Sequence, residues 1–294
     1  MQSSAGMSGP GETSWLPAVI GRRYEIGDEI ARGGCAVVVE ARDLRVGRYV
    51  AIKLPKPGSF DEAAVARLTR EAQVAAAIHH PNVCAVTDAN WLEDGNPFLV
   101  MERLYGETLG SYVTRLGRLD AEEAIEVGLQ TLAGLSAAHA MGVVHRDLKP
   151  DNVFLVYRHG CAPVAKLLDF GLCCRVNAGV AEDVTLTRAG TVVGTPEYMA
   201  PEQASGFRDF DARIDLYAVG VVLYEVLTGT RAFVAEHVSA VLASVLAKRL
   251  PSLRQLRPDL PVSLERVVAR AMNRDPRARY RTAVEFQRDL LEVQ

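Results

Sequence analysis

The segment 214–229, IDLYAVGVVLYEVLTG, places the strongest constraint on the fold of this chain. Drawn as a helix, it is apolar around almost its whole circumference, which is typical of a helix that other elements cover on every side. No window of the chain approaches eighteen uninterrupted apolar residues, so a membrane span does not explain the segment. The sequence therefore predicts a carboxy-terminal helical body built around residues 214–229.

A second long helix is predicted from Asp120 onward. Asp120 and Glu123 stand at the spacing of a capping box, which begins helices. After them, residues recur at steps of three and four on one face: Ile125, Leu129, Leu132, Ser136 and His139. This part of the chain is therefore mostly helical.

The preceding part, residues 24–103, has a different pattern. The short β-branched runs YEIGDEI, AVVVEARD and YVAIKLP are broken by Gly, Asp and Pro, which is typical of antiparallel strands with tight connections. Two more strand-like pieces lie near residues 83–91 and 97–103, and the segment 59–78 reads as a helix that begins at Ser59. We predict an α+β fold with a five-stranded antiparallel sheet and one main helix in this part.

Composition excludes several classes of partner. A formal net charge of -3 over 294 residues gives no broad attraction to nucleic acid or to an anionic membrane. The first 20 residues are rich in Ser, Gly and Pro and lack the features of a secretion signal, so we expect a disordered leader. Five cysteines without a CxxC spacing fit reduced thiols. We expect a cytoplasmic chain, with no nucleic-acid partner and no membrane contact from this segment.

Four motifs carry candidate chemistry. The segment 144–152, VHRDLKPDN, places charged and amide side chains in a fixed order, and LLDFGL follows with Asp169 seventeen residues after Asn152. Upstream lies VAIK, which ends at Lys53, and downstream lies GTPEYMAPE, which ends at Glu202. A solvated polar loop would explain any one charged residue, but not the ordered set.

These motifs resemble the H-R-D-L-x-x-x-N, D-F-G, V-A-I-K and A-P-E elements of protein kinases. The resemblance covers roughly residues 24–293 and is to the eukaryotic-like serine/threonine kinases of bacteria. It implies a two-lobed kinase fold, with a small lobe over residues 21–103 and a larger, mostly helical lobe over residues 104–294. It also implies ATP and Mg2+ as cofactors and protein substrates, including the chain itself.

The resemblance assigns an electrostatic role to each motif residue, because phosphoryl transfer depends mainly on positioning and on charge neutralisation. Asp147 would orient the attacking hydroxyl and accept its proton. Lys53 would pair with the α and β phosphates and be held by Glu71, whose alternative is a solvated helix carboxylate. Lys149 would lie beside the γ phosphate, and only five of the 33 basic residues are lysines.

Magnesium binding is implied for two residues of these motifs. Asp169 and Asn152 supply the hard oxygen ligands that Mg2+ prefers. The resemblance implies that these two residues hold the magnesium ions that bridge the phosphates of ATP.

The segment 30–36, IARGGCA, nearly spells the glycine-rich phosphate clamp of kinases, but Ala31 and Ala36 replace two glycines. Such a clamp presents backbone N–H groups to phosphate, and small residues let the backbone approach and turn. The implied contacts are Ile30, Ala31, Arg32, Gly33, Gly34, Cys35 and Ala36. Cys35 fits either a small apolar filler or a redox-sensitive thiol.

The segment 98–109, FLVMERLYGETL, resembles the hinge that receives adenine. Met101 would be the gatekeeper, Glu102 and Leu104 would offer backbone groups to the base, and Glu107 would reach the ribose. The apolar residues implied around the ring are Ile30, Val38, Ala51 and Phe154.

Regulation is also implied. Lys149 and Thr195 match the serine/threonine branch of the family, so the acceptor is a Ser or Thr hydroxyl. Arg146 would bind a phosphate on the activation loop, where the candidate autophosphorylation sites are Thr185, Thr187 and Thr191. Asp215 would brace the catalytic loop, and Glu202 would pair with Arg279.

Two other functions stay open at this point. One is a pseudokinase that serves as a binding scaffold, and the other is a small-molecule kinase. The presence of every charged motif residue favours an active enzyme, and the A-P-E segment favours protein substrates. A homodimer and a longer, membrane-anchored protein of which this chain is the cytosolic domain are both compatible with the sequence.

Replacing Ala31 and Ala36 together by glycine should tighten ATP binding modestly at most. An alanine held in a conformation open mainly to glycine costs about 1 kcal/mol, which is about a fivefold change in Kd. Calorimetric titration of both proteins with ATP measures the change. A gain from no activity to full activity in the variant would contradict this interpretation of the clamp.

Overall fold

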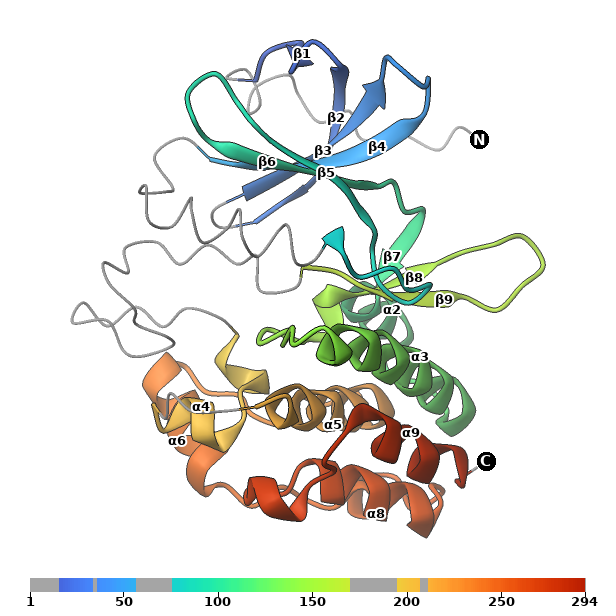
Figure 1. Cartoon of the computed structure of the whole chain (residues 1–294). Coiled ribbons are helices and arrows are strands. Elements are labelled where there is room, and N and C mark those ends of the chain that lie inside the picture. Colours follow the sequence, from blue (N-terminus) through green and yellow to red (C-terminus); the bar gives the residue numbers. More distant parts are fainter. Residues whose placement is uncertain (1–15, 34–35, 57–75, 170–194, 207–210, 294) are drawn as a thin grey trace, which may run out of the picture.

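Two lobes make up the described part of the chain, which in this computed structural model is residues 16–33, 36–56, 76–169, 195–206 and 211–293 (Figure 1). A sheet dominates the small lobe at the top of Figure 1, and helices dominate the large lobe below it. The last strand of the small lobe ends at Glu102, and the first strand of the large lobe begins at Gly106. The two-lobed α+β architecture predicted from the sequence is confirmed.

The sheet of the small lobe is antiparallel throughout and has the strand order β1-β2-β3-β4-β6-β5. Alternate residues of its strands face the core, as the two-residue period of a strand requires. In β3, for example, Val37, Val39 and Ala41 are buried. The strands are β1 Val19–Ile20, β2 Tyr24–Arg32, β3 Ala36–Asp43, β4 Tyr49–Pro55, β5 Val86–Trp91 and β6 Pro97–Glu102.

The predicted count of five strands is wrong, because β1 adds a sixth. Val19 pairs with Glu25 and Ile20 with Tyr24, and Ile20 is 1% exposed. Gly21 and Arg22 both have positive φ angles, of 57° and 53°, and this tight turn folds the chain back onto β2. A two-residue strand is too short to give a periodic signal, so the predicted disordered leader over residues 1–20 extended too far.

Two predicted features lie outside the described residues. One is most of the helix over residues 59–78, and the other is residues 1–15 of the leader.

A three-stranded sheet of β7 Gly106–Thr108, β8 Val153–Val156 and β9 Val164–Leu167 follows the connection between the lobes. Gly106 has a φ of 153°, and a Cβ added to it would lie 1.9 Å from the carbonyl oxygen of Leu155. Only glycine therefore allows the connection to approach β8 this closely. The connection between the lobes is therefore fixed against β8.

The large lobe is built around α5 Arg213–Thr228, in which every residue from Ile214 to Tyr224 is buried. It packs against α3 Ala121–Ala140 and α8 Val262–Ala271. The predicted burial of this segment on all sides is confirmed. The remaining helices are α2 Leu109–Leu116, α4 Pro201–Ala204, α6 Val238–Ala247, α7 Leu253–Leu256 and α9 Ala283–Leu291, with 3-10 turns at Pro150–Asn152, Pro196–Tyr198 and Pro276–Ala278.

The start of α3 also follows the sequence prediction. The Asp120 carboxylate accepts a hydrogen bond of 2.8 Å from the main-chain N–H of Glu123. This bond satisfies one of the free N–H groups of the first turn. The helix therefore begins where the capping pattern placed it.

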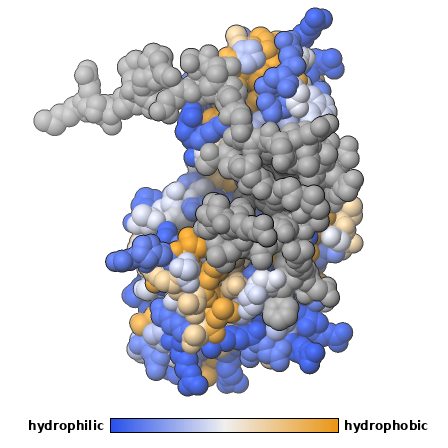
Figure 2. Space-filling view, turned by 90° about the vertical axis from the view of Figure 1, so that its left-hand side faces the viewer, coloured by the Kyte–Doolittle hydropathy of each residue, from blue (hydrophilic) through white to orange (hydrophobic). Residues whose placement is uncertain are grey.

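Figure 2 shows the side of the molecule that carries α6, where apolar residues gather in the middle of the large lobe above a hydrophilic lower edge. Val238 and Leu246 of α6 are exposed. None of the helices within the described ranges is both long enough and apolar enough to cross a membrane.

A buried ion pair joins α4 to the loop before α9. Arg279 is 1% exposed, and its two terminal nitrogens each donate to an oxygen of Glu202 at 2.7 Å. Arg279 also lies over the ring of Tyr217, with its guanidinium carbon 4.8 Å from the ring centre. The pair expected from the sequence is confirmed, and it is bidentate.

Replacing Arg279 by Met should lower the free energy of unfolding by about 3 kcal/mol, because Glu202 would keep a buried charge without its partner. Equilibrium unfolding in urea measures the loss. Arg277→Met is the matched control, since Arg277 lies nearby and is exposed. Equal midpoints for the two variants would show that the pair does not stabilise the lobe.

Candidate active site

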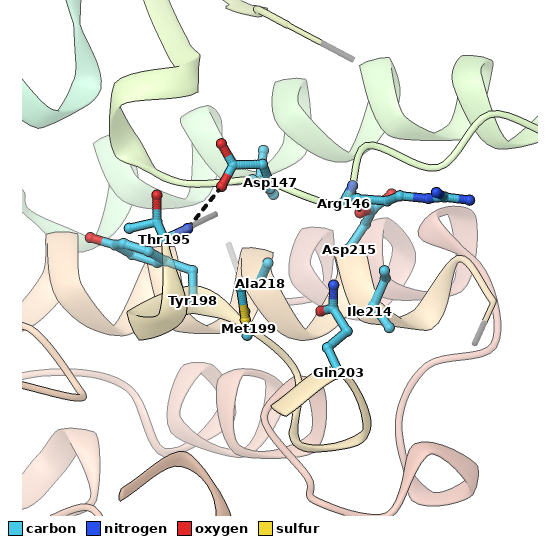
Figure 3. A pocket seen from close by; sticks show the side chains of 10 residues that line it. Arg146, Asp147, Thr195, Tyr198, Met199, Gln203, Ile214, Asp215 and Ala218 are labelled. Carbon is cyan, nitrogen blue, oxygen red and sulfur yellow. Dashed lines mark hydrogen bonds between the residues drawn. The ribbon is translucent and has the colours of Figure 1, made fainter. Parts of the chain in front are cut away.

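The catalytic loop, residues 145–149, is held by a buried carboxylate from α5. Asp215 is 1% exposed and accepts hydrogen bonds of 2.9 Å from the main-chain N–H groups of His145 and Arg146. His139 of α3 lies 2.7 Å from the same carboxylate. The expected role of Asp215 as a brace is confirmed, and Arg146 takes a left-handed φ of 68° beside it (Figure 3).

Asp147 projects from this loop into a network with Lys149 and Thr195. Its Oδ1 accepts from the main-chain N–H of Thr195 at 3.3 Å, drawn dashed in Figure 3. Its Oδ2 lies 3.1 Å from Lys149 Nζ, which also donates to Thr195 Oγ1 at 2.7 Å. The structure thus brings Asp147, Lys149 and Thr195 together, although Thr195 is separated from the loop by 46 residues of sequence.

Asn152 ties this network to the segment that carries Asp169. Its amide nitrogen donates to the Asp147 carbonyl oxygen at 2.7 Å, and its main-chain oxygen accepts from Leu168 N at 2.9 Å. The residue before Asp169 is therefore bonded directly to Asn152. The amide oxygen of Asn152 takes no part in these bonds and is not committed by them.

Lys53 of β4 reaches across from the small lobe to Asp169, with Nζ 2.8 Å from Oδ1. Burial by itself would raise the pKa of the Asp169 carboxyl, but Lys53, His145 and Lys149 outweigh burial and hold its pKa below the usual range. Asp169 is therefore an anion at neutral pH. Its φ of 53° lies in the left-handed region, which aspartate tolerates better than most residues.

An apolar cluster lies beside these charges, where the lobes meet. It contains Val38, Ala51, Met101, Leu104 and Phe154, all of which the sequence assigned to the base-binding pocket. Ile30, assigned to the same pocket, is 38% exposed and is not part of the cluster.

Sequence reasoning missed four other members of this cluster, which are Cys84, Val86, Val156 and Leu168. Burial raises the pKa of the Cys84 thiol to about 12, so the thiol stays protonated and packs as an apolar group. No local pattern marks these residues, because they come from three separate segments, at residues 84–86, at Val156 and at Leu168.

Behind the hinge lies an ion pair that the sequence did not suggest. Lys166 of β9 is 9% exposed, and its Nζ lies 2.6 Å from the Glu102 carboxylate. The same carboxylate oxygen accepts from Ala85 N at 2.8 Å, and Glu102 N donates to the Ala85 carbonyl. The scarcity of lysine was the available signal, since Lys166 stands in an otherwise apolar strand.

The other hinge residues have partners of their own. An Arg103 terminal nitrogen donates to the carbonyl oxygen of Leu104. The Glu107 carboxylate accepts from Arg115 and from the Tyr157 hydroxyl, each at 2.6 Å, and these bonds lower the pKa of Glu107. Contact between Glu107 and a ribose stays a prediction.

The glycine-rich segment forms the end of the β2–β3 hairpin. Ala31 pairs with Val38, and the Gly33 N–H donates to the Ala36 carbonyl at 2.9 Å. Neither Ala31 nor Ala36 has a positive φ. Both alanines therefore fit the strands without strain, and the penalty considered for them does not arise in this conformation.

Several predicted site residues lie outside the described part of the chain. They are Gly34, Cys35, Glu71, and the candidate phosphorylation sites Thr185, Thr187 and Thr191. Arg32, whose side chain bonds to Glu29, lies on the exposed surface of the hairpin.

Comparison with known proteins agrees with this geometry. The protein kinase domain family matches residues 24–290. The chain is 36% identical over 290 residues to serine/threonine-protein kinase pkn3 of Myxococcus xanthus, covering 98% of this chain and 53% of that protein. It is 36% identical over 282 residues to serine/threonine-protein kinase PknB of Mycobacterium leprae, covering 94% and 44%. The chain thus spans about half the length of these relatives.

A solved structure has the same fold. The PknI kinase domain of Mycobacterium tuberculosis superposes with a TM-score of 0.73 at 23% identity, covering 94% of this chain and 98% of that one. Together with a family match over nearly the whole described chain, this shows that the protein belongs to the protein kinase domain family and is related to the serine/threonine kinases of bacteria.

Proposed function

We propose that this chain is an ATP- and magnesium-dependent kinase that phosphorylates Ser and Thr hydroxyls of proteins. One observation carries the proposal. The Lys53–Asp169 ion pair and the Asp147–Lys149–Thr195 network lie on either side of Asn152, which is bonded to Asp147 and to the residue before Asp169. This arrangement supports the proposal, because phosphoryl transfer needs charges positioned around one triphosphate.

Asp147 is the proton acceptor in this proposal. Its carboxylate is fixed by Thr195 N and by Lys149, so a substrate hydroxyl would meet an oriented base. Lys149 would balance negative charge on the transferred phosphoryl group while it holds Asp147 in place. The main-chain bonds to Asp215 keep the loop itself still.

Asp169 and Asn152 are the residues that would hold magnesium. A carboxylate kept ionised by Lys53 and an uncommitted amide oxygen are hard donors, so they fit this ion. Bound magnesium would neutralise phosphate charge. Lys53 would exchange part of its contact with Asp169 for contact with the α and β phosphates.

The adenine ring would lie against the apolar cluster at the hinge. Ala51 and Val38 come from the sheet above, Phe154 comes from β8 below, and Leu168 directly follows β9. Flat apolar walls on two sides suit an aromatic base. The Lys166–Glu102 pair would support this site by fixing the hinge to β9.

The acceptor is proposed to be Ser or Thr because Thr195 and Lys149 are bonded to each other beside Asp147. Protein substrates, including this chain itself, are favoured over small molecules by the A-P-E segment that leads into α4. We place the kinase in the cytosol, or on the cytosolic part of a longer protein, because its cysteine pattern fits reduced thiols.

Arg146 is proposed to order the activation loop after phosphorylation. Its main chain is anchored to Asp215, so its position beside the base is fixed. A phosphate on Thr185, Thr187 or Thr191 would give the guanidinium a bidentate, charge-assisted partner.

Replacing Asp147 by Asn or Lys53 by Met should lower phosphate transfer from labelled ATP to a generic protein by at least about 100-fold, because a placed base or cation is lost. Asp94→Asn is the control, since it removes a carboxylate from an exposed loop. All proteins are assayed with magnesium and after its removal by chelation.

The same assay separates the rival functions. Consumption of ATP without labelling of protein would indicate a small-molecule kinase. Absence of any turnover by the unaltered chain would indicate a scaffold, and either result would overturn the proposal.

Mass spectrometry of the active enzyme should find phosphate on at least one of Thr185, Thr187 and Thr191. The Asp147→Asn protein, expressed alone, should carry none, because it cannot phosphorylate itself. Fully active enzyme with an unmodified loop would contradict this mode of regulation.

A further inference from the structure

A groove of about 380 Å3 lies in the large lobe, between α5, α8 and the segment 248–253, which runs from the end of α6 to the first residue of α7. It shares no lining residue with the small cavity beside Asp147. Its volume falls in the range of sites that bind ligands or peptide side chains. The kinase mechanism makes no use of it.

The floor of the groove is apolar and preformed. Tyr217 and Tyr224 of α5, Phe233, and Met272 after α8 contribute to it. The Tyr224 hydroxyl donates to the Pro251 carbonyl at 3.1 Å, which fastens the segment 248–253 to α5. The groove can therefore accept a bulky apolar side chain without rearrangement of its walls.

The rim of the groove is basic. Lys248, Arg249 and Arg274 are exposed, and no carboxylate in the described part of the chain lies within ion-pair distance of them. Lys248 Nζ donates to the Ala232 carbonyl at 3.2 Å, and Arg274 donates to the Lys248 carbonyl. Carbonyl partners hold these cations at the rim without neutralising their charge.

One acidic residue lines the groove. The carboxylate of Glu265 accepts from Arg254 N at 2.7 Å, and since three basic residues stand against this one carboxylate, the lining of the groove stays basic. Around an apolar floor, three cations without a carboxylate partner among the described residues attract a partner that is apolar at its centre and acidic at its edges.

The rim segment also offers main-chain groups. In the described ranges, the N–H and C=O of Arg249 and Leu250 form no backbone hydrogen bond, and the two residues belong to no helix or strand. An extended peptide can bond to such groups, as strand addition does. A lipid headgroup or a nucleic acid would leave these groups unused, and the net charge of -3 disfavours both.

We propose that this groove docks an acidic peptide segment of a partner protein, with one bulky apolar side chain in the groove and Asp or Glu residues on Lys248, Arg249 and Arg274. Use of the groove by substrates rests on the kinase activity proposed above, whereas its affinity for such a peptide does not.

Selection of a displayed library of random twelve-residue peptides on the whole chain tests the proposal. Enriched peptides should combine a bulky apolar residue with flanking Asp or Glu. Fluorescence anisotropy should then show Kd at least tenfold weaker for Lys248→Glu/Arg249→Glu than for the unaltered chain.

Arg158→Glu/Arg277→Glu is the matched control, because it makes the same change of charge at exposed sites outside the groove and should leave Kd unchanged. Circular dichroism checks that the groove variant and the control variant both fold. If the groove variant does not fold, the single substitution Arg249→Glu takes its place. No enrichment, enrichment of peptides without acidic residues, or equal binding to the groove variant would overturn the proposal. The proposal would also be overturned if no peptide were enriched and the chain bound phosphatidylserine vesicles through Lys248 and Arg249.

The enriched peptide, fused to a generic Ser-containing substrate, connects the groove to catalysis. We expect the fusion to lower KM at least tenfold with kcat unchanged, and the groove variant to lose this gain. Peptide binding without any phosphate transfer would reject the proposed kinase activity and leave the groove assignment intact. Phosphate transfer without peptide binding would reject the groove assignment and leave the proposed kinase activity intact.

Discussion

The buried carboxylate of Asp215 is the interaction on which the active site depends. Placing an anion at 1% exposure inside a helical lobe is unfavourable unless hydrogen bonds compensate it. His139 and the main-chain N–H groups of His145 and Arg146 provide that compensation. The apolar helix that carries Asp215 therefore both fills the core and fixes the loop that contains Asp147.

Three ion pairs likewise fix segments of the molecule that lie far apart in sequence. Glu202–Arg279 fixes the segment after the activation loop, Lys53–Asp169 joins the lobes, and Lys166–Glu102 fixes the hinge. Each joins elements that are remote in sequence, and in each the basic side chain is at most 13% exposed. In such places charge strongly favours one arrangement, because a lost partner leaves an uncompensated ion. The site is therefore positioned mainly by buried charge, and the apolar cluster supplies shape.

Features that depend on neighbouring residues could be read from the sequence. The cap at Asp120 follows from a three-residue spacing, and the burial of α5 follows from a run that is apolar around the whole helix, so both were predicted correctly. The two-residue strand β1 has no period to detect and was missed. Lys166 was missed because its partner Glu102 lies 64 residues away, and local pattern carries no information about that pairing.

By itself the sequence determined the two kinds of lobe, the identity of the charged motif residues and the family resemblance, because these depend on residue order and short-range periodicity. Only the tertiary structure decided that Ala31 and Ala36 are unstrained, that Ile30 stands outside the apolar cluster, and that a basic-rimmed groove opens beside α5. The reason is physical. Backbone angles at a hairpin and the walls of a groove result from packing between distant segments, which compete for the same space.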